Sequence, residues 1–347
     1  MKKRLFAMLL AATLAMAAVS CGNTSSQSDG TAENSASQEE AGEAASHDGT
    51  ETAGTDAAGE QAKEPVEVTF SDDLGREVTV NNPQRVTVLL SSFADVWQSA
   101  GGTITAAVHE TWENDQVTLD ESVTDVGDFE QPDLEQILAS KPDFIIATGN
   151  LDSQTALIDQ FEGAGIPTAF FSVSNFDDYL HMLSICTDIT GRKDLYKTNG
   201  TDVEDEITAL KGRITGEQPT VLVLRTSAKA GVKAKGSKGT VLGEVLADCG
   251  ARNIADSDSG ILEDLSLEAI LRDDPDYIFV TSMGNDTEAA EKALEDALTG
   301  KSAWQSLSAV KNDRYYVMDK DLFNAKPNKR WAEAYRQIID ILYPEAE

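Results

Sequence analysis

Short apolar runs alternate with stretches of helical periodicity over residues 66–174. Residues 66–70 and 77–80 alternate around Asp72-Asp73-Leu74-Gly75, a pattern that predicts a hairpin. Four further runs predict strands: 85–90, 103–108, 144–148 and 167–171. The stretches between them predict helices at 93–100, 133–140 and 154–164. Strands that alternate with helices indicate a parallel sheet covered by helices on both faces.

Residues 216–347 repeat this scheme. Strands are predicted at 220–225, 277–280 and 315–318, and helices at 240–249, 267–272, 287–298 and 331–342. Between the halves, residues 175–215 contain no strand signal, and their apolar positions recur at helical spacing. This segment is either one long helix or two helices in series. The pattern therefore predicts two Rossmann-like α/β lobes with mainly parallel sheets, joined by a long rigid interlobe helix.

The first twenty residues have the organisation of an export signal. Lys2, Lys3 and Arg4 precede an apolar stretch over residues 5–17, and small residues lead to Cys21. An ordinary secretory signal cut after Ser20 remains an alternative to lipid attachment at Cys21. Residues 21–64 are polar, acidic and free of aromatic residues, which predicts a disordered tether because too little apolar surface is available to offset ordering.

The charge of the chain limits its partners. The formal net charge is −32, and residues 65–347 hold 50 of the 60 acidic residues against 24 of the 28 basic ones. The phosphates of a nucleic acid would be repelled, so no nucleic-acid partner is expected. Apart from Cys21, Cys186 and Cys249 lack metal-like spacing, and we expect two buried free thiols, with a disulfide between them left open.

A short internal repeat relates the two lobes. Residues 131–146 align with residues 264–279 at a constant offset, and each copy comprises a capped short helix, a Pro-Asp turn and a buried strand. Leu134, Ile137 and Leu138 are expected to face the core, which leaves Glu135, and its counterpart Glu268, pointing to solvent. Both acids suit the first turn of a helix, and both also suit a paired docking surface for a two-subunit partner.

The order of these features resembles the bacterial solute-binding lipoproteins for iron siderophores, haem and vitamin B12. The resemblance covers residues 66–347 and rests on the helix-linked lobes, the paired Leu-Glu-x-Ile-Leu segments and the lipoprotein start. It implies an ABC-importer permease dimer with its ATPase as partner, contacted by Glu135 and Glu268. It also implies a membrane anchor at Cys21 and a shallow ligand cleft between the lobes.

In parallel α/β lobes, ligands bind beyond the carboxyl ends of the strands. The segment 225–238 carries five basic residues and no acidic one, which predicts an anion-binding wall, although a solvated lysine loop is the alternative. A second basic cluster follows the last strand. The candidate ligand-binding residues are Ser92, Phe93, Trp112, Phe129, Arg225, Lys235, Lys238, Met283, Phe323, Lys326 and Arg330.

The expected ligand is an anionic metal chelate, most simply a ferric siderophore. Among three histidines only His109 lies near the predicted cleft, so neither a protein-held metal nor a resident cofactor is expected. Haem binders of the resembled family often carry Tyr or Met where residues 128–131 stand, and this sequence has neither. Corrinoid and haem remain alternatives, as does a sensor or adhesion role. No catalytic motif is present, and an enzyme is not expected.

Overall fold

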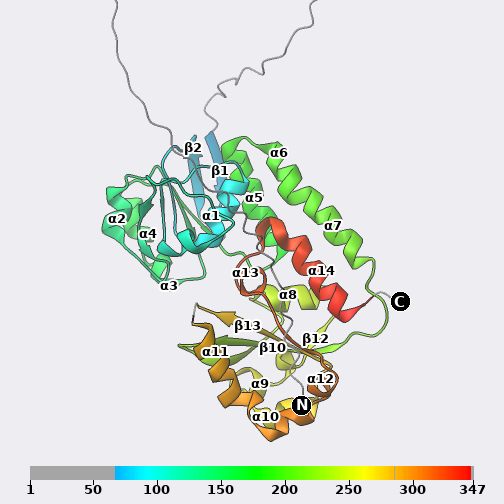
Figure 1. Cartoon of the computed structure of the whole chain (residues 1–347). Helices are drawn as coiled ribbons and strands as arrows, with labels where there is room; N and C mark the ends of the chain where they lie inside the picture. The colour runs from blue at the N-terminus through cyan, green and yellow to red at the C-terminus, as the bar shows by residue number, and fades with distance from the viewer. Residues whose placement is uncertain (1–66, 285, 345–347) are drawn as a thin grey trace, which may run out of the picture. The chain divides into compact units, whose positions relative to one another are not determined.

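A computed structural model describes residues 67–284 and 286–344 (Figure 1). The predicted export signal, Cys21 and the tether lie outside these residues. The first described elements are β1 (Glu67–Ser71) and β2 (Glu77–Asn81), which pair antiparallel as predicted. Within the described residues, no helix combines the length and apolar character that crossing a membrane requires.

The first lobe is built on a five-stranded parallel sheet with the order β5-β4-β3-β8-β9. Its strands are β3 (Val86–Val88), β4 (Ala106–Ala107), β5 (Thr124–Asp125), β8 (Phe144–Thr148) and β9 (Thr168–Phe171). Its connections contain α1 (Ser91–Ser99), η1 (His109–Glu113), the small pair β6 (Gly127–Asp128) and β7 (Gln131–Pro132), α2 (Leu134–Ala139), α3 (Asp152–Thr155) and α4 (Ile158–Gly163). All five residues of β8 are buried, as expected for a central strand covered on both faces.

The second lobe has a second five-stranded sheet, with the order β11-β10-β13-β14 and β12 paired to β10. Its strands are β10 (Thr220–Ser227), β11 (Gly231–Lys235), β12 (Arg252–Asn253), β13 (Tyr277–Met283) and β14 (Tyr315–Val317). The helical elements are α8 (Val241–Asp248), η3 (Ile254–Ser257), α9 (Ser259–Leu262), α10 (Leu267–Asp273), α11 (Thr287–Leu294), η4 (Glu295–Thr299), η5 (Ser302–Ser306), α12 (Ser308–Lys311), α13 (Lys320–Phe323), η6 (Asn328–Arg330) and α14 (Trp331–Leu342). The predicted α/β fold class is confirmed.

Two strands of the second sheet were not predicted, the two-residue β12 and the longer β11. Residues 225–238 read as a basic loop, whereas Gly231–Lys235 forms β11 and pairs antiparallel with β10. Val232 and Ala234 are buried while Lys233 between them is exposed, so the strand has the period-2 pattern of a half-buried edge. The lysines obscured this alternation in the sequence.

Two helices in series connect the lobes. Helix α5 (Phe176–Thr190) begins in a capping box formed by Asn175 and Asp178, and it ends at Gly191, whose φ of 65° is left-handed. The chain then continues through α6 (Lys193–Tyr196), the π turn η2 (Lys197–Thr201) and α7 (Asp202–Lys211). The sequence left open one long helix or two helices in series, and the structure shows two helices in series. In Figure 1, α7 runs beside α14, and the two helices contact each other.

The apolar core forms three clusters, one of which extends through both lobes. A cluster containing Phe170 lies on one face of the first sheet, and a cluster containing Trp304 lies on one face of the second. The third includes Phe144 of the first sheet, Tyr179 of α5 and Ile338 of α14. Because this cluster is continuous, the connecting helices are held to both lobes by buried apolar surface.

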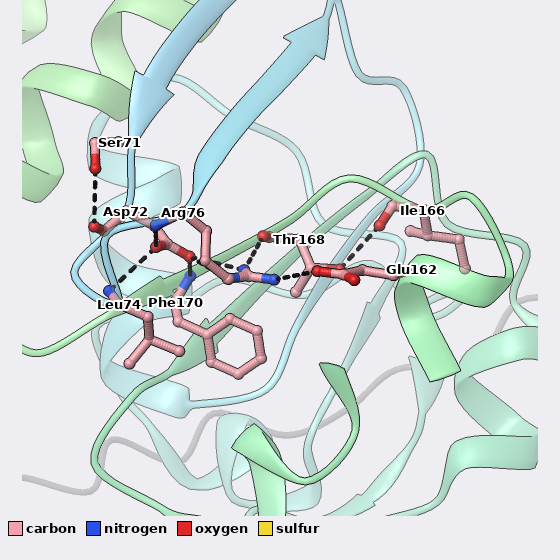
Figure 2. Close-up of polar contacts among 8 residues, drawn as sticks. All are labelled: Ser71, Asp72, Leu74, Arg76, Glu162, Ile166, Thr168 and Phe170. Atoms are coloured by element: carbon pink, nitrogen blue, oxygen red, sulfur yellow. Dashed lines mark hydrogen bonds and ion pairs between the residues drawn. The ribbon is translucent and has the colours of Figure 1, made fainter. Parts of the chain in front are cut away.

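A buried carboxylate, that of Asp72, helps to fasten the N-terminal hairpin to the edge of the first sheet (Figure 2). The Asp72 side chain has no exposed surface, and it accepts hydrogen bonds from the backbone N–H groups of Leu74, Arg76 and Phe170. The Arg76 guanidinium lies 2.7 Å from Asp72 and donates to the Thr168 carbonyl. These bonds satisfy the Asp72 carboxylate, which explains how a charged group is tolerated there.

Candidate functional site

A small cavity lies where β10 and β13 reach their carboxyl ends, beside the start of α8. Its volume is about 60 Å³, enough for several waters or one carboxylate group but not for a whole chelate. The lining residues are Val223, Arg225, Lys235, Gly239, Thr240, Val241, Leu242, Thr281, Phe323, Asn324 and Lys326. The position agrees with the rule that ligands of parallel α/β lobes bind beyond the carboxyl ends of strands.

The first turn of α8 forms one wall of the cavity. Thr240 caps the helix, and its hydroxyl oxygen accepts from the backbone N–H of Gly243 at 3.2 Å. The first N–H groups of a helix have no partner within it, and they carry the positive end of the helix dipole. Because Gly239 to Leu242 line the cavity, this positive end lies at its wall.

Three basic side chains share the cavity. Arg225 comes from β10, Lys235 from β11 and Lys326 from the segment after α13, and none of them has an ion-pair partner among the described residues. Burial lowers the pKa of the Arg225 guanidinium. Burial also lowers the pKa of Lys235, with smaller contributions from Arg225 and Lys233.

The pKa of Lys326 is also lowered. Burial lowers the pKa of its ammonium, the Asp178 carboxylate opposes this shift, and Arg225 adds to it. Cations that are desolvated and mutually repelling favour an added anion, since its charge offsets both costs. The cavity therefore has the electrostatics of an anion site, and we expect it to accept a carboxylate or a comparable oxyanion.

Two other predicted cations lie outside the cavity. The Lys238 side chain is 87% exposed and lies 3.2 Å from Glu244. Arg330 donates to both carboxylate oxygens of Glu333, at 2.8 and 3.0 Å, and this pairing raises the pKa of the guanidinium. Neither residue lines the cavity, and each has an acidic partner. The ion pairs of Lys238 with Glu244 and of Arg330 with Glu333 explain these two basic residues without a ligand.

The predicted apolar residues divide into buried and exposed groups. Phe93 is only 1% exposed and packs edge-on against Phe171, so the expectation that its ring walls a cleft is corrected. Phe323 is equally buried but lines the cavity. Trp112 and Met283 are 45% and 36% exposed. They do not line the cavity, although both remain accessible to a larger ligand.

Ser92 and Phe129 make backbone contacts that the sequence did not reveal. The Ser92 carbonyl accepts from the side chain of Asn328 at 2.8 Å. The Phe129 carbonyl accepts from the Gln154 side chain at 2.9 Å, and the Phe129 ring is half-buried. Neither residue lines the cavity. Their roles toward a ligand stay predictions.

Several lining residues were missed in the sequence. Thr240 was predicted as a helix start but not as part of the site, and Asn324 and Thr281 carried no signal of their own. One sequence signal could have identified Thr240 as part of the site: Gly239-Thr240 stands directly after the basic segment and before an apolar helix. A helix cap next to unpaired cations is a recognisable anion-binding pattern.

The paired glutamates occupy matching places in the two lobes. Glu135 lies in the first turn of α2, which is capped by Asp133, and Glu268 in the first turn of α10, which is capped by Ser266. Both are exposed, and no ion pair to either is present among the described residues. The expectation that Leu138 faces the core is wrong, because its side chain is 38% exposed beside Glu135. Helix α2 is a short surface turn in which Ile137 alone is buried.

Potential metal ligands do not gather in the described part of the chain. No group of three or more His, Cys, Asp or Glu residues that could hold a metal occurs there. His109 Nδ1 lies 2.7 Å from Asp125 at the surface. Cys186 and Cys249 are buried free thiols, as predicted, and burial raises their pKa values.

The family of the chain follows from comparison with known proteins. The family model described as "Periplasmic binding protein" matches residues 86–322, more than half of the chain. The chain therefore belongs to this family, and the predicted class of ABC-importer solute-binding protein is confirmed.

Curated relatives and solved structures agree with this assignment. The chain is 24% identical to the "Uncharacterized ABC transporter substrate-binding lipoprotein YvrC" of Bacillus subtilis over 82% of this chain and 88% of that protein. It is 25% identical to the "Fe(3+)-citrate-binding protein YfmC" of the same organism, over 72% and 78% of the two chains. The fold is similar to Staphylococcus aureus SirA complexed with staphyloferrin B, with a TM-score of 0.63, 20% identity and coverage of 79% and 98%.

Proposed function

We propose that the protein captures an anionic ferric chelate, most simply a ferric siderophore with carboxylate groups, and delivers it to an ABC-type importer. The observation that carries this proposal is the meeting of Arg225, Lys235 and Lys326, all without an acidic partner among the described residues, at the positive end of α8. A carboxylate arm fits the cavity of about 60 Å³, while the rest of the chelate remains outside it.

The relatives support an iron ligand of this charge. YfmC is named as a binding protein for Fe(3+)-citrate, and SirA was crystallised with staphyloferrin B. The three cations stand out in a region where residues 65–347 carry a net charge of −26. A local positive site on an acidic surface gives selectivity, because anions are repelled everywhere else.

Delivery requires a membrane location and a docking surface. We propose that Cys21 carries a lipid and that Glu135 and Glu268 contact basic residues of a permease dimer, coupled to its ATPase. The relative YvrC is named as a lipoprotein, and the two glutamates are exposed at matching places in the lobes. A full-length Cys21→Ser variant should be released from the membrane, retain ligand affinity and support uptake poorly. Undiminished uptake would contradict a transport role for the anchor.

The ligand class is tested by titrating the purified chain with a panel while following intrinsic tryptophan fluorescence. The panel contains ferric citrate, a ferric catecholate, a ferric hydroxamate, haem, cyanocobalamin and iron-free citrate. We expect the tightest binding for an anionic ferric chelate with free carboxylates, because its charge complements the cavity. Binding of cyanocobalamin or haem alone would favour the corrinoid or haem alternative. Binding of none of them would refute the proposal.

A further inference from the structure

The segment that supplies Lys326 to the cavity is fixed at its far end to the first lobe. Phe323, Asn324 and Lys326 line the cavity, and Asn328 follows two residues later. The Asn328 amide donates to the Ser92 carbonyl and to the Asp95 carboxylate, both at 2.8 Å. The ammonium of Lys329 lies 3.7 Å from Asp95. All three contacts reach helix α1.

This junction is buried and polar. Asp95 and Asn328 are 3% and 1% exposed, and Ser99 donates to Asp95 at 3.3 Å. Asn328 has a φ of 52°, in the left-handed region that asparagine tolerates better than most residues. Burying a carboxylate and an amide costs free energy that an apolar pair would not.

The same helix also receives the connection between the lobes. The Asn199 amide, in the π turn η2, donates to the Ser99 carbonyl at 2.8 Å. The Asn199 carbonyl in turn accepts from the buried Tyr179 hydroxyl at 2.8 Å. We call Ser92, Asp95 and Ser99 the α1 seat. The connection between the lobes, at η2, and the segment η6 of the second lobe are thus both bonded to the α1 seat within two helical turns.

We propose that Asn328 is a positioning residue, which sets the angle between the lobes through the α1 seat and thereby places Lys326 in the cavity. The part concerning Lys326 rests on the proposed function, whereas the part concerning the lobe angle does not. The amide is used only as a donor here, because its Oδ1 has no partner among the described residues. Asn328→Asp therefore removes the contact at nearly unchanged size and places two carboxylates face to face.

The lobe angle is measured with spin labels on the full chain carrying Cys21→Ser. Asp159→Cys on α4 and Glu288→Cys on α11 provide exposed attachment sites, while Cys186 and Cys249 are buried. We expect a narrow distance distribution in the parent chain and a broadened or shifted one in Asn328→Asp. Asn328→Gly should behave likewise, because glycine keeps the left-handed backbone without the side chain. Asn312→Asp, the same change at an exposed site, should leave the distribution unaltered.

Exchanging Asp95 and Asn328 distinguishes a specific positioning role of Asn328 from a general destabilisation of the fold. In Asp95→Asn with Asn328→Asp, the donor and acceptor of the bond between these two residues are exchanged while the bond to the Ser92 carbonyl stays lost, so the distribution should narrow in part. Affinity for ferric citrate should fall at least about tenfold in Asn328→Asp and recover in part in the swapped chain. An unchanged distance in both Asn328 variants would overturn the inference. A changed distance with unchanged affinity would overturn the role toward Lys326, and failure of the parent chain to bind any anionic chelate would refute the proposed function alone.

Discussion

At the residue scale, the cavity brings together three cations that form no ion pair with an acidic side chain in the described part of the chain. Arg225, Lys235 and Lys326 repel one another and are partly desolvated, whereas Lys238 and Arg330 nearby have acidic partners. An anion in the cavity would relieve this repulsion. The three residues should therefore affect ligand affinity much more than their neighbours of the same charge.

Replacing one cavity cation tests this distinction. A hydrogen bond to a charged group contributes about 1.5–3 kcal/mol, so Lys326→Gln should weaken ferric citrate binding by about 10- to 100-fold. Lys229→Gln is the matched control, since Lys229 is exposed in the β10–β11 turn and does not line the cavity. Titration calorimetry measures both. An equal loss in the two variants would show that only long-range charge matters.

Asp95 gives a pH dependence of stability with a defined sign. Burial raises the pKa of its carboxyl above 3.8, against hydrogen bonds from Asn328 and Ser99 and the charge of Lys329. A group with a raised pKa stabilises the fold below its unfolded pKa, and this contribution is lost as the pH rises through the folded pKa. The stability of Asp95→Asn minus that of the parent should therefore increase from pH 3 to pH 7 in urea unfolding. A difference that stays constant with pH would contradict this account.

At the element scale, the buried carboxylate of Asp72 is one of the main attachments of the hairpin β1–β2 to the first sheet. Asp72 has no exposed side-chain surface, and it joins the turn of the hairpin to β9. Asp72→Ala leaves Arg76 and three backbone N–H groups without this acceptor, and we expect it to lower the free energy of unfolding by about 3 kcal/mol. Glu162→Gln removes only the exposed pair with Arg76 and should cost less than about 0.5 kcal/mol. Equal effects in urea unfolding would contradict the assignment of Asp72.

Elements with a clear hydrophobic pattern were predictable from the sequence. The bounds of β8 and α14 agree with the prediction, because a bounded apolar run and an amphipathic stretch before the C-terminus are local signals. Strand β11 was not predicted, since Lys233 and Lys235 outweighed the alternation of Val232 and Ala234. Its pairing depends on β10, which is a tertiary contact.

The site was also predictable only in part, because tertiary packing decides which of the candidate residues line it. Charge bias identified Arg225, Lys235 and Lys326, and these three converge on one cavity. Phe93 was also a candidate ligand-binding residue, but it lies in the core because it is on the inner face of α1. Which face of a short helix is buried follows from packing, so residue type and position alone could not separate Phe93 from Phe323.

At the scale of the whole molecule, the two lobes carry the ligand site and the proposed docking surface on different elements. The cavity lies in the second lobe, whereas Glu135 and Glu268 lie on the first turns of α2 and α10. Neither glutamate lines the cavity. Delivery and capture should therefore be separable by mutation.

The double variant Glu135→Ala with Glu268→Ala tests this separation. We expect ferric citrate affinity to be unchanged and cellular uptake of the same chelate to fall at least about tenfold, because two charge contacts to the permease are removed. Asp159→Ala with Glu288→Ala removes two exposed acids elsewhere and is the matched control. Uptake that survives the first pair, or that falls equally in both, would contradict the docking role.

The central claim is that the protein binds an anionic ferric chelate through its three unpaired cations. The most direct measurement is the calorimetric Kd of the full chain for ferric citrate, compared between the parent and the variant Arg225→Gln, Lys235→Gln, Lys326→Gln. We predict saturable binding by the parent chain and loss of detectable binding in the variant, with its folded circular dichroism spectrum retained. Equal affinity of both proteins, or no binding by either, would contradict the claim.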